Sequence, residues 1–161
     1  ELACHSKPQA DPTLEEERSD MTPPLPEPTE TILVVDDEPE VLSMTAEFLR
    51  RIGYTVLCTE NPREALRIAR TTLGTLHLLL TDVVMPVMNG LELTERLRAI
   101  HPRIKGLFMS AYTTDVVEDY YGVQIAPGEP FLVKPFTTVD LSSKVRAVLN
   151  RLSPFSKPNR R

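Results

Sequence analysis

The sequence predicts an α/β protein in which a five-stranded parallel sheet is covered by helices on both faces. Two observations support this fold class. Five short apolar runs have the character of strands that are buried on both faces. A segment with apolar residues at helical spacing follows each run, and strict alternation of strand and helix is typical of parallel sheets. We expect the strands at 31–35, 54–58, 76–80, 104–109 and 131–133.

The helices have their own signals. The first ends at Gly53, a residue that commonly follows a helix. Residues 61–64 combine a cap, a first-turn proline and an acid, which predicts a helix start. Thr137 and Asp140 have the spacing of a capping box ahead of a last helix with one apolar stripe. We expect helices near 41–52, 61–70, 90–100, 113–121 and 137–152.

The composition divides the chain into three parts. Residues 1–28 are rich in proline and acids and poor in apolar residues, so we expect a disordered linker; a docking motif is the alternative. Residues 29–152 have the size of one small domain. Residues 153–161 carry three bases and two prolines, and we expect a flexible basic tail. Because the chain starts at Glu1 rather than Met, we expect it to be a piece of a longer protein.

Overall composition excludes several classes of function. The net charge of −5 argues against nucleic acid as the main partner. No apolar run is long enough to span a membrane, so we expect no direct membrane contact. Cys4 and Cys58 form neither a disulfide framework nor a metal motif, which favours the reducing cytoplasm.

Four of the five predicted strands are followed by side chains that can do chemistry. Asp36 and Asp37 follow the first strand, Asp82 the third, Ser110 the fourth and Lys134 the fifth. Each has a simple structural explanation by itself, such as a helix cap, a turn or a solvated charge. Parallel sheets bind ligands beyond the carboxyl ends of their strands, where all five residues are expected together. Their joint placement therefore predicts a functional site.

Three clustered carboxylates repel one another unless a cation joins them. Oxygen ligands favour a hard cation, Mg²⁺ or Mn²⁺. One carboxylate could then attack a phosphoryl group and form an acyl phosphate. The metal ion and the Lys134 ammonium would neutralise charge, and the Ser110 hydroxyl could donate to a phosphoryl oxygen.

Four stretches together resemble the receiver domain of two-component response regulators. They are residues 32–38 (ILVVDDE), 81–90 (TDVVMPVMNG), 107–112 (LFMSAY) and 131–136 (FLVKPF). The resemblance covers essentially residues 29–152. It implies a flavodoxin-like doubly wound fold with five helices and the strand order 2-1-3-4-5.

The resemblance also implies roles for single residues. Asp82 corresponds to the phosphoacceptor, and Asp36 and Asp37 to the metal-binding pair. The backbone carbonyl of Val84 corresponds to a further metal ligand, and Lys134 to the phosphate partner.

Further positions correspond to switch and rate-tuning residues of the family. Ser110 matches the switch hydroxyl, and Phe131 the aromatic switch, although it lacks the hydroxyl of the more common Tyr. Val84 and Tyr112 occupy positions that tune the hydrolysis rate, and both are bulky enough to hinder a water. The Lys134–Pro135 bond is a candidate cis peptide that would aim the ammonium into the site.

The resemblance implies phosphotransfer from a histidine kinase or a histidine phosphotransfer domain, and a weak homodimer through the fourth helix, fifth strand and fifth helix. We expect the C-terminal receiver of a hybrid sensor histidine kinase; the alternative is a stand-alone regulator. A degenerate receiver that acts only as a protein-binding module would have lost an acid or the lysine. A haloacid-dehalogenase-type phosphatase would need a second acid two residues after its nucleophile, where this chain has Glu38 followed by Pro39. Such a phosphatase would also leave Asp82 unexplained. A flavodoxin would need a phosphate-cradling loop of hydroxyl residues and glycines after the first strand, and residues 36–39 (DDEP) cannot form one.

Overall fold

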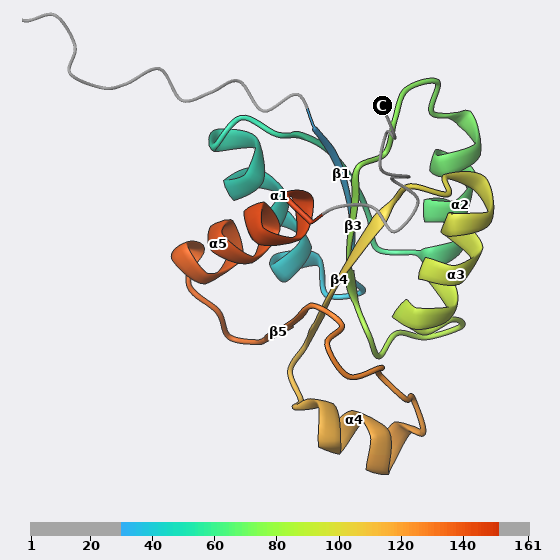
Figure 1. Ribbon diagram of the computed structural model, residues 1–161, viewed down its shortest axis with the longest axis vertical. Helices are drawn as coiled ribbons and strands as arrows, with labels where there is room; N and C mark the ends of the chain where they lie inside the picture. Colours follow the sequence, from blue (N-terminus) through green and yellow to red (C-terminus); the bar gives the residue numbers. More distant parts are fainter. Residues whose placement is uncertain (1–29, 152–161) are drawn as a thin grey trace, which may run out of the picture.

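A computed structural model describes residues 30–151 of the protein. The predictions for residues 1–28 and 153–161 lie outside the described residues. The chain forms one five-stranded parallel sheet in the order β2-β1-β3-β4-β5, which confirms the predicted fold (Figure 1). The strands are β1 (Thr31–Val35), β2 (Thr55–Thr59), β3 (Leu78–Asp82), β4 (Lys105–Ser110) and β5 (Phe131–Val133).

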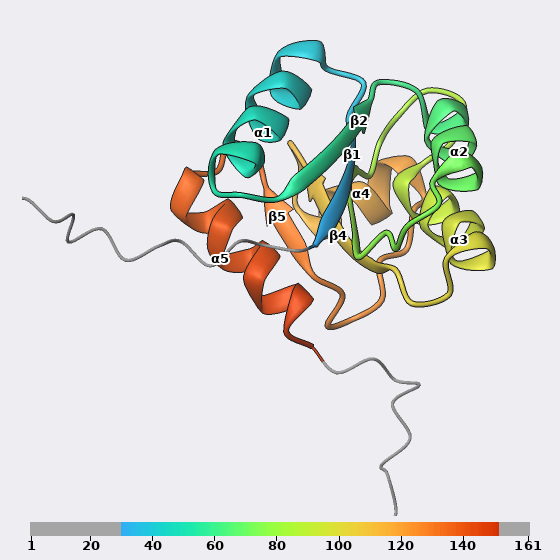
Figure 2. The same ribbon diagram turned by 90° about the horizontal axis from the view of Figure 1, so that it is seen from above.

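Helices cover both faces of the sheet (Figures 1 and 2). Ile32 and Val34 of β1 point to the face where α1 and α5 pack, whereas Leu33 and Val35 point to the face of α2 and α3. This alternation follows from the period of two in a strand and explains why the strands are apolar throughout. The helices are α1 (Pro39–Arg51), α2 (Pro62–Thr71), α3 (Gly90–Ile100), α4 (Thr114–Tyr121) and α5 (Thr138–Leu149).

The predicted caps form. The Asn61 side chain accepts a hydrogen bond from the Arg63 amide at the start of α2. Thr137 and Asp140 form a complete capping box at the start of α5, in which each side chain accepts from the other residue's amide. These local interactions satisfy amides that a helix start leaves without partners.

The third strand lies two residues later than its apolar run. The run begins at Leu76, but β3 spans Leu78–Asp82, because the polar residues Thr81 and Asp82 are buried and continue the ladder. Asp82 is therefore the last residue of β3, in register with Met109 of β4, rather than the first residue after the strand. The rigid sheet itself positions this carboxyl group.

Within residues 30–151, no helix has the length and apolar character needed to cross a bilayer.

Candidate functional site

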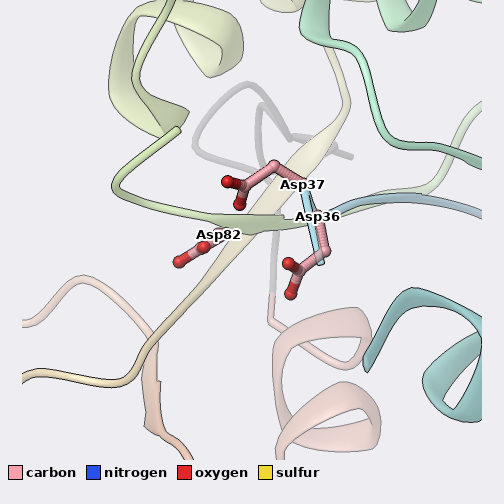
Figure 3. Close-up of side chains that lie close together, drawn as sticks. All are labelled: Asp36, Asp37 and Asp82. Atoms are coloured by element: carbon pink, nitrogen blue, oxygen red, sulfur yellow. The ribbon is translucent and has the colours of Figure 1, made fainter. Parts of the chain in front are cut away.

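Three aspartates meet at the carboxyl edge of the sheet. Asp36 and Asp37 directly follow β1, and Asp82 ends the neighbouring strand β3. Each offers a carboxylate oxygen, and these oxygens lie within 4.8 Å of one another. Figure 3 shows the three side chains gathered at the ends of the two strands. Asp36 and Asp82 are buried and Asp37 is half-buried, so water screens their mutual repulsion poorly.

Asp36 is held on both carboxylate oxygens. Its Oδ1 accepts a hydrogen bond from the Glu38 amide at 2.9 Å, and its Oδ2 accepts one from the Lys134 ammonium at 2.6 Å. The first contact is local and tightens the turn from β1 into α1. The second joins two residues that are 98 positions apart in the sequence, and it bounds the site on the side of β5.

Lys134 brings a positive charge to the carboxylates. It directly follows β5, where its amide donates to the Ser110 carbonyl at 2.7 Å, and the Lys134–Pro135 peptide bond is cis. Its Nζ lies 3.4 Å from a Glu38 carboxylate oxygen and 3.6 Å from Asp82 Oδ2. With a side chain that is only 10% exposed, Lys134 forms a nearly buried bridge to Asp36 and Asp82.

Burial and like charge dominate the electrostatics of the acids. Burial, together with the charges of Asp36 and Asp37, raises the pKa of Asp82 to about 7, against the opposing effect of Lys134. Burial also raises the pKa of Asp36, although its hydrogen bond from Lys134 opposes the rise. Burial alone would lower the pKa of Lys134, but the hydrogen bond to Asp36 and the charges of Asp82 and Asp36 raise it above its ordinary value. Lys134 is thus fully protonated, while Asp82 gains or loses its proton near neutral pH.

The backbone beside Asp82 is tightly packed. The Val83 amide donates to the Met109 carbonyl, and the Gly90 amide at the start of α3 donates to the Val83 carbonyl. A Cβ on Gly90 would lie 2.4 Å from the Asp82 carbonyl oxygen. Glycine is therefore required where α3 approaches the end of β3. The half-buried Val84 follows in the same loop.

The other predicted residues, Ser110, Tyr112 and Phe131, lie near the ends of β4 and β5 and differ in burial. Ser110, buried at the end of β4, accepts a hydrogen bond from the Tyr112 amide at 3.1 Å. Tyr112 is 44% exposed. Phe131 is half-buried and packs against the apolar cluster around Phe108 and Val117.

Two residues of this region lie beyond the sequence predictions. Glu38 approaches Lys134, and its place directly after the acid pair was a signal that could have identified it. Tyr121 at the end of α4 contacts the Tyr112 ring, with 5.6 Å between ring centroids. No local pattern pairs residues on either side of a helix, so only the structure reveals this contact.

An apolar hollow of about 300 Å³ adjoins Lys134 between α1 and the segment that leads into α5. Met44 on its rim is 72% exposed. The hollow is lined by Glu38, Val41, Met44, Thr45, Ala111, Lys134, Pro135 and Phe136. The charged site therefore opens beside an apolar surface.

Known proteins share this sequence pattern. The family model of the response regulator receiver domain matches residues 32–146. The Sensor kinase CckA of Brucella abortus is 36% identical over 121 residues, which cover 75% of this chain and 13% of that protein. The Probable transcriptional regulatory protein TcrX of Mycobacterium tuberculosis is 33% identical over 121 residues, 75% of this chain and 50% of that protein. The chain thus spans half or less of the length of these two relatives.

Solved structures share the fold. The receiver domain of the hybrid histidine kinase CckA has 34% sequence identity and a TM-score of 0.62, and the match covers 74% of this chain and 98% of that one. A response regulator receiver domain protein from Methanospirillum hungatei has 27% identity and a TM-score of 0.61, with 74% and 93% covered. The matched residues include the three aspartates, Ser110 and Lys134. The chain therefore belongs to the family of response regulator receiver domains.

Proposed function

We propose that Asp82 accepts a phosphoryl group from a phosphohistidine of a histidine kinase or histidine phosphotransfer domain. A carboxylate oxygen of Asp82 attacks phosphorus, the P–N bond to the imidazole breaks, and the leaving imidazole nitrogen keeps the electron pair and takes up a proton. The product is an acyl phosphate on Asp82. The observation that carries this proposal is the placement of the Lys134 ammonium 3.6 Å from Asp82 Oδ2, beside two further carboxylates.

The three carboxylates also form a suitable set of ligands for Mg²⁺ or Mn²⁺. The ligand atoms of the cluster are all oxygens, which hard cations prefer. A bound cation would also relieve the electrostatic repulsion among the three carboxylates. We propose that Asp36, Asp37, Asp82 and the Val84 carbonyl hold the ion. When bound, the cation neutralises charge on the phosphoryl oxygens and favours the ionised, nucleophilic form of Asp82.

The other side chains have distinct tasks in this proposal. Lys134 offers its ammonium as a point charge to a phosphoryl oxygen, and it can leave Asp36 for that purpose because Asp82 is only slightly farther away. Ser110 offers a hydroxyl donor to another phosphoryl oxygen. Tyr112 and Val84 limit the approach of water to the acyl phosphate.

The apolar hollow beside Lys134 supports a protein, rather than a small metabolite, as the phosphodonor. Its lining continues from the site onto the exposed face of α1, where Met44 projects. An apolar side chain next to the partner's phosphohistidine would fill it and hold the histidine in line with Asp82. The relatives include both a sensor kinase and a transcriptional regulator, so the hybrid-kinase context stays a prediction.

The test is phosphorylation of the full chain with phosphoramidate or acetyl phosphate, with and without Mg²⁺, followed by intact-mass spectrometry. We expect uptake of one phosphoryl group that requires Mg²⁺ and is abolished in Asp82→Asn. Asp115→Asn is the matched control, because Asp115 is an exposed acid on α4. Uptake by Asp82→Asn at the wild-type rate would show that the phosphoacceptor is another residue.

A further inference from the structure

Helix α4 is the most weakly anchored helix of the described domain. It is eight residues long, and Val117 is its one buried residue. Thr113 at its N-cap makes no side-chain capping hydrogen bond, unlike Asn61, Asn89 and Thr137 at the starts of α2, α3 and α5. Few buried contacts and a missing cap leave α4 easy to displace, so any additional contact has a large effect on its position.

Two tyrosines supply such a contact. Tyr112 lies in the loop before α4, and Tyr121 is the last residue of the helix. Their ring centroids are 5.6 Å apart at an interplanar angle of 39°, and the neighbouring Tyr112 side chain raises the pKa of Tyr121. Side chains at a helix end lean back toward the N-terminus, which lets Tyr121 reach the loop. The pair thus ties the last turn of α4 to the loop that follows β4.

The same loop is attached to the phosphorylation site. Ser110 Oγ, at the end of β4, accepts a hydrogen bond from the Tyr112 amide at 3.1 Å. If this hydroxyl turns toward a phosphoryl group on Asp82, either the hydrogen bond breaks or Tyr112 moves with the oxygen. The first case releases the Tyr112 backbone from its restraint at the end of β4, and the second shifts the Tyr112 ring relative to Tyr121.

We propose that Tyr112 transmits the state of Ser110 to α4: its ring holds Tyr121 in the unphosphorylated protein and releases it when Ser110 turns toward the phosphoryl group. This inference rests on the proposed phosphorylation of Asp82. Phe131, at the position that resembles the aromatic switch, has no hydroxyl. The inference therefore gives part of the switch to a second aromatic contact, the one between Tyr112 and Tyr121. Tyr112 and Tyr121 act here as positioning residues, since the carboxylate oxygens of the site come from Asp36, Asp37 and Asp82.

The experiment uses NMR on the full chain, with beryllofluoride and Mg²⁺ as the phosphoryl mimic. In the free protein we expect nuclear Overhauser contacts between the Tyr112 and Tyr121 rings, and we expect the mimic to abolish them. Amide exchange at Val117–Tyr121 should rise about 2- to 10-fold on addition of the mimic, the range expected for loss of one aromatic pair.

Variants separate the pair from the rest of the switch. Tyr112→Ala and Tyr121→Ala should raise amide exchange in α4 to the level of the mimic-bound wild type, and the mimic should then add little. Tyr120→Ala is the matched control, because Tyr120 is the adjacent tyrosine, is 82% exposed and lies outside the pair. It should leave both the exchange and its response unchanged.

The outcomes distinguish the two proposals. Absence of any amide shift next to Asp82 on adding beryllofluoride and Mg²⁺ would contradict the proposed function itself. Shifts next to Asp82 together with ring contacts that persist in the mimic-bound state would overturn the role of the tyrosine pair. The role of the tyrosine pair would also be overturned if the amides of α4 exchanged at the same rate in Tyr121→Ala as in the wild-type protein without the mimic.

Discussion

Asp82 is a carboxyl group that the folded protein holds in its protonated form more readily than the unfolded chain does. Burial and the charges of Asp36 and Asp37 raise its pKa from 3.8 to about 7. The folded state therefore binds the proton more tightly, and this contribution to stability is complete below pH 4. It is lost as the pH rises through 7, where the folded protein must keep three charged carboxylates together.

We therefore predict that Asp82→Asn stabilises the metal-free protein at neutral pH. The free energy of unfolding should rise by about 1–3 kcal/mol at pH 8, and the difference from wild type should vanish near pH 4. Urea unfolding in the presence of a chelator, followed by circular dichroism from pH 4 to pH 8, measures it. If the difference in unfolding free energy between Asp82→Asn and wild type were the same at pH 4 and pH 8, this would contradict the raised pKa of Asp82.

At the scale of elements, the contact between α3 and β3 shapes the site. A Cβ on Gly90 would lie 2.4 Å from the Asp82 carbonyl oxygen and 3.1 Å from Thr81 Cγ2. Gly90→Ala should therefore push the start of α3 away from the end of β3, at a cost of about 1–3 kcal/mol in unfolding free energy. Affinity for Mg²⁺ at the proposed site, measured by calorimetric titration, should fall as well, because the loop after β3 that carries the proposed Val84 ligand moves.

Gly74→Ala is the matched control for this prediction. Gly74 has no atom within 4 Å of an added Cβ, and its φ angle is not in the left-handed region. The substitution should change the unfolding free energy by less than about 0.5 kcal/mol. Equal effects of the two substitutions would show that Gly90 is no more constrained than a surface glycine.

The caps at the starts of α4 and α5 allow a second comparison. The Thr137 hydroxyl accepts a hydrogen bond from the Asp140 amide, so Thr137→Ala should reduce the unfolding free energy by about 1 kcal/mol. Thr113 occupies the same position at α4 without a side-chain capping bond, and Thr113→Ala should have a clearly smaller effect. Urea unfolding of both variants tests the pair; a larger loss in Thr113→Ala would mean that the caps are wrongly assigned.

At the scale of the whole molecule, the domain of residues 30–151 has apolar clusters on both faces of its sheet. Residues 1–28 hold six of the 15 prolines and few apolar residues, a composition that cannot bury much surface. We predict that a chain starting at residue 29 melts within a few degrees of the full chain in differential scanning calorimetry. A large drop in melting temperature would show that the first 28 residues pack on the domain.

The sequence by itself determined which segments become strands and helices and which residues stand at the strand ends. Continuous apolar runs, helical periodicity and the caps at Asn61 and Thr137 are local properties, because they depend on neighbours within a few residues. Strict alternation was enough to predict a parallel sheet. The order of its strands came from the resemblance to receiver domains, since periodicity does not select the neighbour of a strand.

Only the tertiary structure decided how the site is assembled. The hydrogen bond from Lys134 to Asp36 joins residues 98 positions apart. Its length depends on how β5 pairs with β4 and on the conformations of the two side chains. The burial that raises the pKa of Asp82 comes from packing around the end of β3, two residues beyond its apolar run. The pairing of Tyr112 with Tyr121 likewise follows from the path of the loop and the length of α4. Such contacts depend on three-dimensional packing, which no short stretch of sequence encodes.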